Sequence, residues 1–309
     1  MIVITGAFGY IGSMLVDVLS DEELLLIDKY MYMTNESWII NTIKKNNIMY
    51  IKSDVLNVTL DIFKNANAII NLAAYVGENI CNKVSKEELY NTNVYSAVKL
   101  AKIASQFEIP FIQMSTCSNY GIKDNIVDED SLLEPTNRYA ESKVMAETLT
   151  KVYPSTIIIR GATVYGLSHR MRFDLILNEW VKDAYFTNTI NVYNPYAYRP
   201  LIHVKDMCNA IRHILLLALN NRLEYNIINV GSVNYQKIEI AKSISRYLDV
   251  KVMIKESSSD KRNYRVSFDR LRRLGFNTLY TLDDGILEVL EYLKNNPHKK
   301  EEIEQYANI

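Results

Sequence analysis

Cysteine and histidine are scarce in this chain of 309 residues, which holds three cysteines and four histidines. The cysteines, Cys81, Cys117 and Cys208, lie far apart, and neither they nor the histidines show the spacing of zinc ligands. We therefore expect no metal site and no disulfide framework. Thiols without partners are typical of a reducing compartment, so the sequence predicts a cytoplasmic protein.

Long apolar runs and an excess of one charge are also missing. No stretch reaches the roughly 18 apolar residues of a membrane-spanning helix. The first expected strand begins at Ile2, which leaves no room for a signal peptide. Lysine and arginine number 35 against 36 acidic residues, for a net charge of −1. We expect neither a membrane nor a nucleic acid as a partner.

Proline-rich or glycine-rich linkers are absent, and 48% of the residues are hydrophobic. A chain of this length and composition can bury a sizeable core, in one large domain or two modest ones.

Short apolar runs alternate with helical patterns in the first half of the chain. The expected strands cover residues 2–5, 24–28, 49–52, 68–73, 110–115 and 156–160, and the main helices cover 10–20, 85–107 and 137–153. Strands without an alternating polar face are typical of a parallel sheet that helices cover on both sides. The pattern predicts an α/β fold built on a doubly wound parallel sheet.

The rhythm changes after Gly166. Helices are expected near residues 173–184, after His203, and near 236–248 and 281–295, with strands near 190–193 and 225–230. We predict one domain over residues 1–166, to which segments around 200–230 return. Residues 167–309 would form a smaller mixed α/β domain.

The segment TGAFGYIG places three glycines between the first strand and the first helix. Glycine permits a tight turn, and the N–H groups at the helix N-terminus attract a diphosphate, so the loop predicts a dinucleotide site. The residues expected to contact the cofactor here are Gly6, Phe8, Gly9, Tyr10, Ile11 and Gly12.

Acidic residues follow the next two strands. Asp28 stands where a carboxylate binds the ribose hydroxyls of NAD and repels the 2′-phosphate of NADP, although Lys29 beside it weakens that choice. Asp54 is placed to reach the adenine, with Val55 next to it, or to cap the following helical segment.

Tyr139 and Lys143 lie four residues apart in NRYAESKVMAE and would share one helix face. A positive charge near a phenol favours the phenolate, which makes the tyrosine usable as a general base. Beside a dinucleotide, such a base serves the removal of hydride from an alcohol.

Together these segments resemble the extended short-chain dehydrogenase/reductase family, the NAD-dependent epimerases and dehydratases of nucleotide sugars. LAAYVG at 72–77, STCSNYG at 115–121, YAESK at 139–143, RGATVYG at 160–166, RPLIHVKD at 199–206 and INVGS at 228–232 look like its motifs, in its order. The resemblance implies a Rossmann domain, NAD as the cofactor and a nucleotide-diphosphate sugar as the substrate.

The resemblance also implies residue roles. Tyr139 would take the proton of a sugar hydroxyl that Thr116 also binds, and Lys143 would bind the nicotinamide ribose and lower the pKa of Tyr139. Ser115, next to Thr116, is a further candidate for substrate binding. The remaining cofactor contacts would come from Leu72, Ala73, Ala74 and Asn93.

Four arginines are candidates for the substrate diphosphate. Arg199 and Arg262 resemble arginines with that role in the family, although both could be solvated surface charges. Arg170 and Arg172, in SHRMRFDL, could clamp a diphosphate or begin a solvated helix. We include Asn178, in the helix that follows, among the substrate-binding residues.

Two departures from the family separate possible reactions. Thr116 is followed by Cys117 and Ser118, where the 4,6-dehydratases carry an Asp-Glu pair and the decarboxylases a glutamate, so we do not expect water loss or decarboxylation. Cys117 is expected to be a buried filler rather than a reactive thiol. SxRMRxDL stretches occur in relatives that oxidise or reduce sugar nucleotides at C4.

The sequence therefore predicts an NAD-dependent nucleotide-sugar 4-epimerase that works through a transient 4-keto sugar. A 4-dehydrogenase or 4-ketoreductase would use the same residues, and an inactive NAD-binding module is a third alternative. The wide apolar face over residues 90–104 fits the helical dimer interface that is common in the family, so we expect a homodimer.

Overall fold

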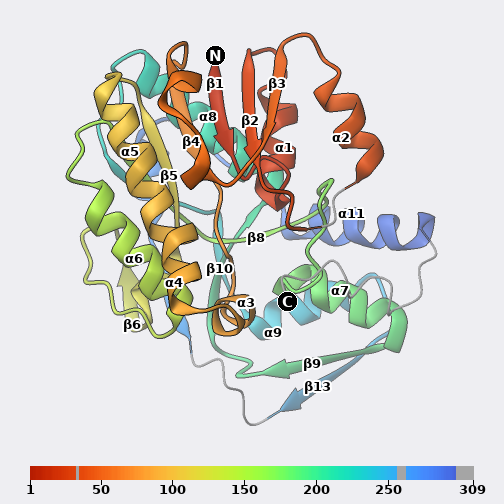
Figure 1. Cartoon of the computed structure of the whole chain (residues 1–309). Coiled ribbons are helices and arrows are strands. Elements are labelled where there is room, and N and C mark those ends of the chain that lie inside the picture. Colours follow the sequence, from red (N-terminus) through yellow and green to blue (C-terminus); the bar gives the residue numbers. More distant parts are fainter. Residues whose placement is uncertain (33–34, 256–261, 297–309) are drawn as a thin grey trace.

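A parallel sheet of seven strands forms the centre of the computed structural model, which describes residues 1–32, 35–255 and 262–296 (Figure 1). The strand order is β11–β7–β5–β4–β1–β2–β3. The strands are β1 (Ile2–Thr5), β2 (Leu24–Asp28), β3 (Ile48–Lys52), β4 (Ala68–Asn71), β5 (Phe111–Thr116), β7 (Thr156–Gly161) and β11 (Ile227–Val230). The predicted doubly wound α/β fold is confirmed, and its order reverses between β1 and β4.

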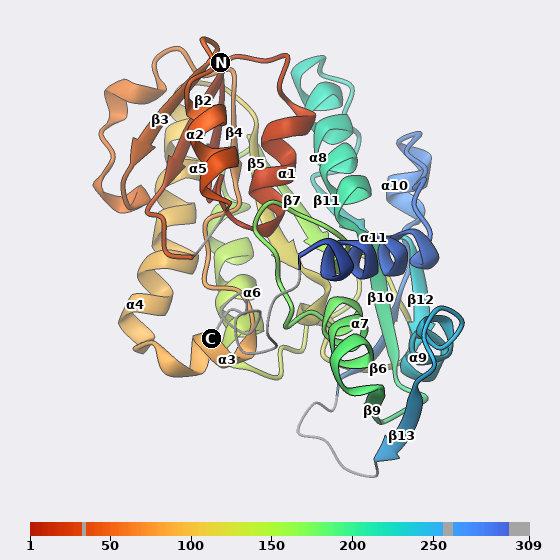
Figure 2. The same ribbon diagram turned by 90° about the vertical axis from the view of Figure 1, so that its right-hand side faces the viewer.

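Alternating residues of each central strand enter two different apolar cores. Ile2 and Ile4 pack on one face of the sheet and Val3 on the other. Helices α1 (Tyr10–Val18) and α8 (Val204–Leu219) cover the first face, and α5 (Ser96–Gln106) covers the second (Figure 2). Burial on both faces explains why the strands read as continuous apolar runs.

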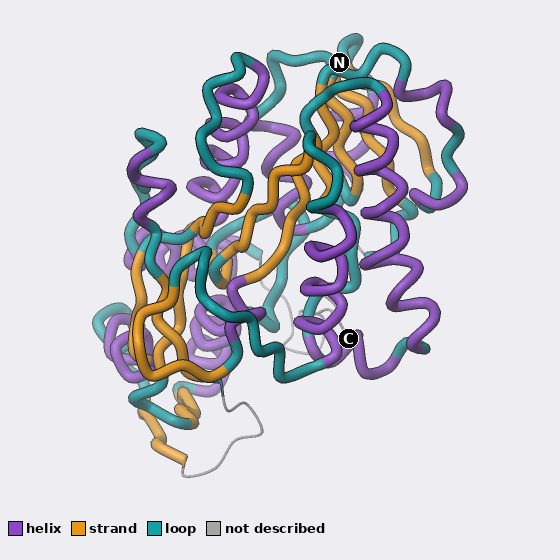
Figure 3. The backbone as a smooth tube through the Cα atoms, turned by 90° about the vertical axis from the view of Figure 1, so that its left-hand side faces the viewer, coloured by secondary structure: helices purple, strands orange, loops and turns teal. Residues whose placement is uncertain are grey.

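The helix expected at residues 85–107 has three parts in the structure. It begins as α4 (Lys86–Tyr90), passes through a π-helical turn, η3 (Asn91–Tyr95), and continues as α5. Next to it runs α6 (Arg138–Thr150), which carries the YxxxK pair (Figure 3). The Asn137 side chain accepts the N–H of Ala140 at 2.9 Å and so fixes the start of α6.

A second apolar core lies at the other end of the molecule (Figures 1 and 2). Its elements are α7 (Ile176–Thr187), β9 (Thr189–Tyr193), α9 (Lys237–Ile244), β13 (Lys251–Lys255) and α11 (Leu282–Asn295). Helix α7 begins later than expected, because residues 173–175 still belong to the preceding loop. The division into two domains at residue 166 stays a prediction.

The structure contains further short elements that the sequence patterns do not reveal. They are α2 (Glu36–Ile43), α3 (Glu78–Lys83), β6 (Ile122–Val127), β8 (Thr163–Tyr165), β10 (Tyr198–His203), β12 (Val233–Gln236), β14 (Asn263–Val266) and α10 (Asp269–Arg273). Val164 and Ile202 pack in the first core, whereas their neighbours Tyr165 and Leu201 pack in the second. Strands β8 and β10 thereby hold the two cores together.

Within the described ranges, no helix combines the length and apolar character that crossing a membrane requires.

Candidate active site

A cleft of about 620 Å³ opens at the carboxyl ends of the central strands. This volume lies within the roughly 300–1,000 Å³ of small-molecule sites. Its lining includes segments that follow β1, β2, β4 and β5, together with residues of α6, α7 and β9. The cleft therefore extends from the point where the strand order reverses to the second core. Open α/β sheets bind their ligands at this point of reversal.

The glycine loop forms one wall of the cleft and leaves no room for side chains. Gly6 has φ +68°, and a Cβ on Gly12 would lie 2.2 Å from the carbonyl oxygen of Gly6. No side chain caps the N-terminus of α1, so the first N–H groups of this helix stay available to a ligand. The loop thus fits the diphosphate of a dinucleotide, as the sequence predicts.

Asp28 stands at the end of β2 with both carboxylate oxygens oriented by backbone. Oδ2 accepts the N–H of Phe8 at 2.9 Å, and Oδ1 accepts the N–H of Tyr30 at 2.7 Å. Burial raises the pKa of Asp28, although these two hydrogen bonds oppose the rise. Each oxygen keeps a lone pair for a further donor, so the carboxylate can accept two ribose hydroxyls.

Asp54 has the capping role that the sequence left open, and its contact with the adenine stays a prediction. Its side chain accepts the N–H of Leu56 at 2.9 Å and caps the short 3₁₀ helix η1 (Val55–Asn57), and the residue also lines the cleft. Lys29 lines the cleft as well and lies 3.3 Å from Asp54. Its positive charge is therefore shared with a carboxylate.

Thr116, Tyr139 and Lys143 line the same cleft as the glycine loop. The Thr116 side chain lies close enough to Tyr139 to favour its phenolate form. The Lys143 ammonium group donates to the carbonyl of Met114 at 3.0 Å, which holds it under the end of β5. The structure brings together the three residues that the sequence predicts to be catalytic.

Burial controls the acidity of both α6 residues. It raises the pKa of Tyr139, and Arg172 and Thr116 only oppose this rise. It lowers the pKa of Lys143 to about 8. The pKa of Tyr139 is thus not lowered in the structure, because loss of hydration opposes the phenolate more strongly than the neighbouring cations favour it.

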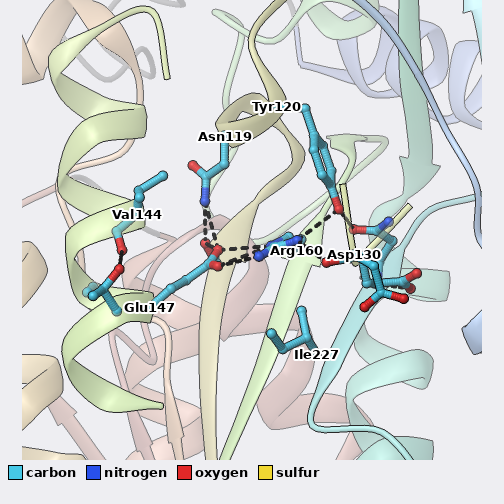
Figure 4. A network of polar contacts seen from close by, with 12 residues as sticks. Asn119, Tyr120, Asp130, Val144, Glu147, Arg160 and Ile227 are labelled. Atoms are coloured by element: carbon cyan, nitrogen blue, oxygen red, sulfur yellow. Dashed lines mark hydrogen bonds and ion pairs between the residues drawn. The ribbon is translucent and has the colours of Figure 1, made fainter. Parts of the chain in front are cut away.

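Ser115 lines the cleft, and its hydroxyl is bound within the protein. Its hydroxyl donates to the buried carboxylate of Glu147 and accepts from Asn119 at 3.1 Å. Glu147 in turn holds Arg160 at 2.8 Å, so this polar network lies behind the active-site strand (Figure 4). The hydrogen bonds of the Ser115 hydroxyl lie inside this network, and its contact with a substrate stays a prediction.

Cys117 is 1% exposed, and its thiol contacts the carbonyl of Arg160 at 3.2 Å. Burial raises the pKa of this thiol. Both observations agree with the packing role that the sequence favours over a reactive one.

The four candidate arginines line the cleft, but they do not act as two pairs. Arg172 is held by Asp174, at 3.0 Å through Nε and 2.5 Å through Nη2. Arg199 donates to the carbonyls of Tyr198 and Arg262 at 2.8 and 2.5 Å. A carboxylate therefore already occupies the fork of Arg172, so the predicted clamp of Arg170 and Arg172 is not formed as a pair.

Two predicted site residues lie outside the cleft lining. Asn93 bonds to the backbone of Tyr75 and to the Ser142 hydroxyl, and so joins the loop after β4 to α6. Asn178 is fully buried and bonds to the Tyr10 hydroxyl at 3.1 Å and to the backbone of Gly166. Both side-chain amides form hydrogen bonds within the protein and so help to position the walls of the site, and their contacts with a ligand stay predictions.

Several cleft residues carry no motif that we recognise in the sequence. They are Tyr30, Tyr32, Thr92, Ser96, Glu179, Trp180, Lys237 and Tyr264, among others. Burial and the charge of Asp183 raise the pKa of Glu179 to about 7. Ser118 and Asp174 also line the cleft, and their places in STCSNYG and SHRMRFDL could have identified them, as could the position of Tyr264 two residues from Arg262.

Comparison with known proteins identifies the family of this chain. The sequence model of the NAD dependent epimerase/dehydratase family matches residues 2–231. This match confirms the resemblance inferred from the motifs and the prediction of NAD as the cofactor.

Curated relatives are identical to this chain at about a quarter of the aligned positions. The trifunctional UDP-glucose 4,6-dehydratase/UDP-4-keto-6-deoxy-D-glucose 3,5-epimerase/UDP-4-keto-L-rhamnose-reductase RHM1 of Arabidopsis thaliana is 23% identical, over 96% of this chain and 47% of its own length. The chain thus spans about half the length of the first such relatives. The UDP-glucose 4-epimerase of Streptococcus mutans is 29% identical, over 48% of this chain and 46% of its own length.

Among solved structures, the UDP-glucuronic acid 4-epimerase of Bacillus cereus, in complex with UDP-glucuronic acid and NAD, has the same fold. Its TM-score is 0.80 at 22% identity, and the match covers 95% of this chain and 99% of that one.

Proposed function

Because this chain belongs to the NAD-dependent epimerase/dehydratase family, we propose that it is an NAD-dependent nucleotide-sugar epimerase acting at C4 through a transient 4-keto sugar. The main support for this function is that Thr116, Tyr139 and Lys143 line the same cleft as the glycine loop and Asp28. Tyr139, as the proton acceptor for an alcohol, would then share the cleft with NAD as the hydride acceptor.

The surroundings of Thr116 support epimerisation over water loss. Cys117 is buried behind the cleft wall, and Ser118 stands in the lining where a dehydratase needs a carboxylic acid. The Ser118 hydroxyl lies 3.5 Å from that of Tyr264, so this part of the wall offers two neutral hydroxyl groups. Neutral hydroxyls can position a sugar, but they cannot protonate a leaving hydroxyl as an acid of low pKa does.

In the proposed mechanism, Thr116 and Tyr139 bind the C4 hydroxyl, and Tyr139 takes its proton. Bound by the glycine loop and Asp28, NAD would supply the group that exchanges hydride with C4. Tyr139 gives the proton back when the keto sugar has turned over in the cleft. Lys143 stays within the same wall through its bond to Met114, where it holds the ribose, and Arg199 and Arg262 bind the substrate diphosphate.

A 4-dehydrogenase or 4-ketoreductase is the second candidate. The SxRMRxDL stretch favours it, since such stretches occur in relatives that oxidise or reduce sugar nucleotides at C4. In this chain the stretch contributes Arg170, Arg172 and Asp174 to the cleft wall. The two candidates share the same proton chemistry and differ in whether the cofactor is regenerated.

The deciding experiment uses purified protein and a panel of UDP-, GDP-, CDP- and dTDP-sugars without added cofactor. We expect NMR to identify a C4 epimer while absorbance shows no accumulation of NADH. Accumulation of NADH with a keto sugar, or turnover only with external cofactor, would replace the epimerase by the second candidate. A 6-deoxy-4-keto product would contradict both.

The Asp28 carboxylate is expected to select NAD over NADP. A carboxylate beside the ribose repels a 2′-phosphate, so replacing Asp28 with serine should narrow the preference by about 10- to 100-fold. Calorimetric titration of each variant with both cofactors measures the ratio. An unchanged ratio would show that another residue makes the choice.

We also propose a homodimer that forms through the η3–α6 face. Tyr95, Met145 and Leu149 expose 51%, 40% and 37% of their surface on neighbouring helices. Light scattering at micromolar concentration should give twice the chain mass, and Leu149→Arg should give a monomer. Ile254→Arg, at a 59% exposed site on β13, is the matched control and should stay dimeric. A monomeric wild-type protein would contradict this proposal.

A further inference from the structure

Arg170 is a buried cation without a counter-ion among the described residues. Its side chain is 1% exposed, and no described residue forms an ion pair with its guanidinium group. Its Nε atom is buried and has no hydrogen-bond partner within the described ranges. Burial and the charge of Arg172 lower the pKa of Arg170 to about 10, and the carboxylate of Asp174, which Arg172 already binds, only opposes this shift.

Such an arrangement is costly in a folded protein. Burying a charge without a partner carries a desolvation penalty of several kcal/mol, so buried cations are normally paired. The buried arginine of the network behind the active site, Arg160, follows this rule and is held by Glu147 at 2.8 Å. Arg170 departs from it while lining the ligand cleft, which points to an anion that comes from a ligand.

The neighbours of Arg170 keep its hydrogen-bonding edge available. The ring of Tyr32 lies 4.4 Å from the guanidinium carbon and covers the face of the group. Stacking uses the face, whereas N–H donors point outward from the edge of the plane. The Tyr32 hydroxyl is likewise buried without a partner among the described residues. Two polar groups from separate loops therefore lack a partner at the same place.

The loop that carries Arg170 is fastened to the glycine loop. The Ser168 hydroxyl donates to the carbonyl of Tyr10 at 2.7 Å and lies 3.0 Å from the hydroxyl of Ser13. The backbone N–H of Arg170 points to the same Ser168 hydroxyl at 3.4 Å. Arg199 and Arg262, by contrast, come from β10 and the segment before β14. Arg170 thus belongs to the wall that carries the glycine loop.

We propose that Arg170 binds a diphosphate group in this cleft, and that its attachment to the glycine loop favours the diphosphate of NAD over that of the nucleotide sugar. The guanidinium fork matches two phosphate oxygens, while Arg172 is occupied by Asp174. The inference rests on the NAD binding of the proposed function. It reassigns Arg170, which the sequence placed with the substrate, to the cofactor.

The test measures binding on protein from which nucleotide has been removed. Isothermal titration with NAD, adenosine and UDP separates the two diphosphates from the nucleoside. Arg170→Met keeps the length of the side chain and removes its charge. We expect it to weaken NAD about 10- to 100-fold, as loss of one or two charge-assisted hydrogen bonds does. Adenosine and UDP should bind as they do to the wild type. Arg170→Lys should recover part of the NAD affinity.

Thermal unfolding provides an independent readout. Because Arg170→Met removes an unpaired buried charge, the ligand-free variant should melt about 2 °C or more above the wild type, while its stabilisation by NAD decreases. Opposite changes in stability and affinity would not follow from a merely structural arginine. Arg246→Met is the control, since it removes the same charge at an exposed pair with Asp283 and should alter neither quantity.

Each outcome decides one question. Weaker UDP binding with unchanged NAD binding would keep the diphosphate role and give it to the substrate. Equal affinities of Arg170→Met and the wild type for both NAD and UDP would overturn the inference and leave the proposed function standing. A wild-type protein that binds no NAD would instead overturn the proposed function.

Discussion

Replacing Tyr139 with phenylalanine should lower kcat by about 10³-fold, within the range that general acid–base groups contribute. The variant keeps the ring, which packs beside Tyr75, Cys81 and Leu89, and loses only the hydroxyl. Binding of NAD should therefore be retained, as measured by calorimetry. Steady-state rates with the substrate found in the panel give the loss.

The pH profile of the same variant tests the proton role directly. Because burial raises the pKa of Tyr139, its phenol is protonated at neutral pH, and the phenolate fraction grows as pH rises. The kcat/KM of the wild type should therefore increase from neutral to alkaline pH. Tyr139→Phe should lose this dependence. Tyr153→Phe, which lies just beyond the end of α6, is the matched control. If Tyr139→Phe retained the wild-type rate, another group would have to accept the proton.

Replacing Glu147 with leucine should lower the free energy of unfolding by about 3–5 kcal/mol, the cost of breaking a buried ion pair. Glu147 and Arg160 are 3% and 4% exposed, and two nitrogens of Arg160 bind the Glu147 carboxylate (Figure 4). The substitution leaves Arg160 buried with only the Tyr120 hydroxyl and the Glu129 carbonyl as acceptors. Urea unfolding measures the loss.

A double variant separates the charge from the packing. Methionine at both 147 and 160 removes the two charges together, so it should be more stable than Glu147→Leu. A single-variant loss of about 1 kcal/mol or less, as for an exposed pair, would contradict the assignment of this network as a buried ion pair. Because Ser115 bonds to Glu147 and precedes Thr116, we also expect the single variant to lose activity.

The main features of the cofactor site could be predicted from local sequence. Gly6 and Gly12 can be identified from the sequence because only glycine fits a loop in which a Cβ would meet backbone atoms. Asp28 is found by its place at the end of an apolar run, and Tyr139 and Lys143 by helical spacing. In each case the information lies within a few residues, so an α/β fold and an NAD site follow from the pattern.

Residues whose partners lie far along the chain could not be placed in this way. Asn178 bonds to Tyr10, which is 168 residues away, and Ser115 bonds to Glu147, which is 32 residues away. Asn93 is taken up by Tyr75 and Ser142. The sequence shows that these side chains are polar. It does not show which of their donors and acceptors find partners within the protein.

By itself, the sequence determined the main strands and helices of the central sheet, the glycine loop, the acidic residue that ends β2 and the tyrosine–lysine pair, because backbone sterics and helical periodicity are local. Only the tertiary structure decided which of two neighbouring arginines keeps its donors for a ligand. Arg172 pairs with Asp174, whereas Arg170 is buried beside Tyr32 and forms no ion pair with a described residue. Charge pairing depends on distances between folded segments, and those distances exist only after the chain has packed.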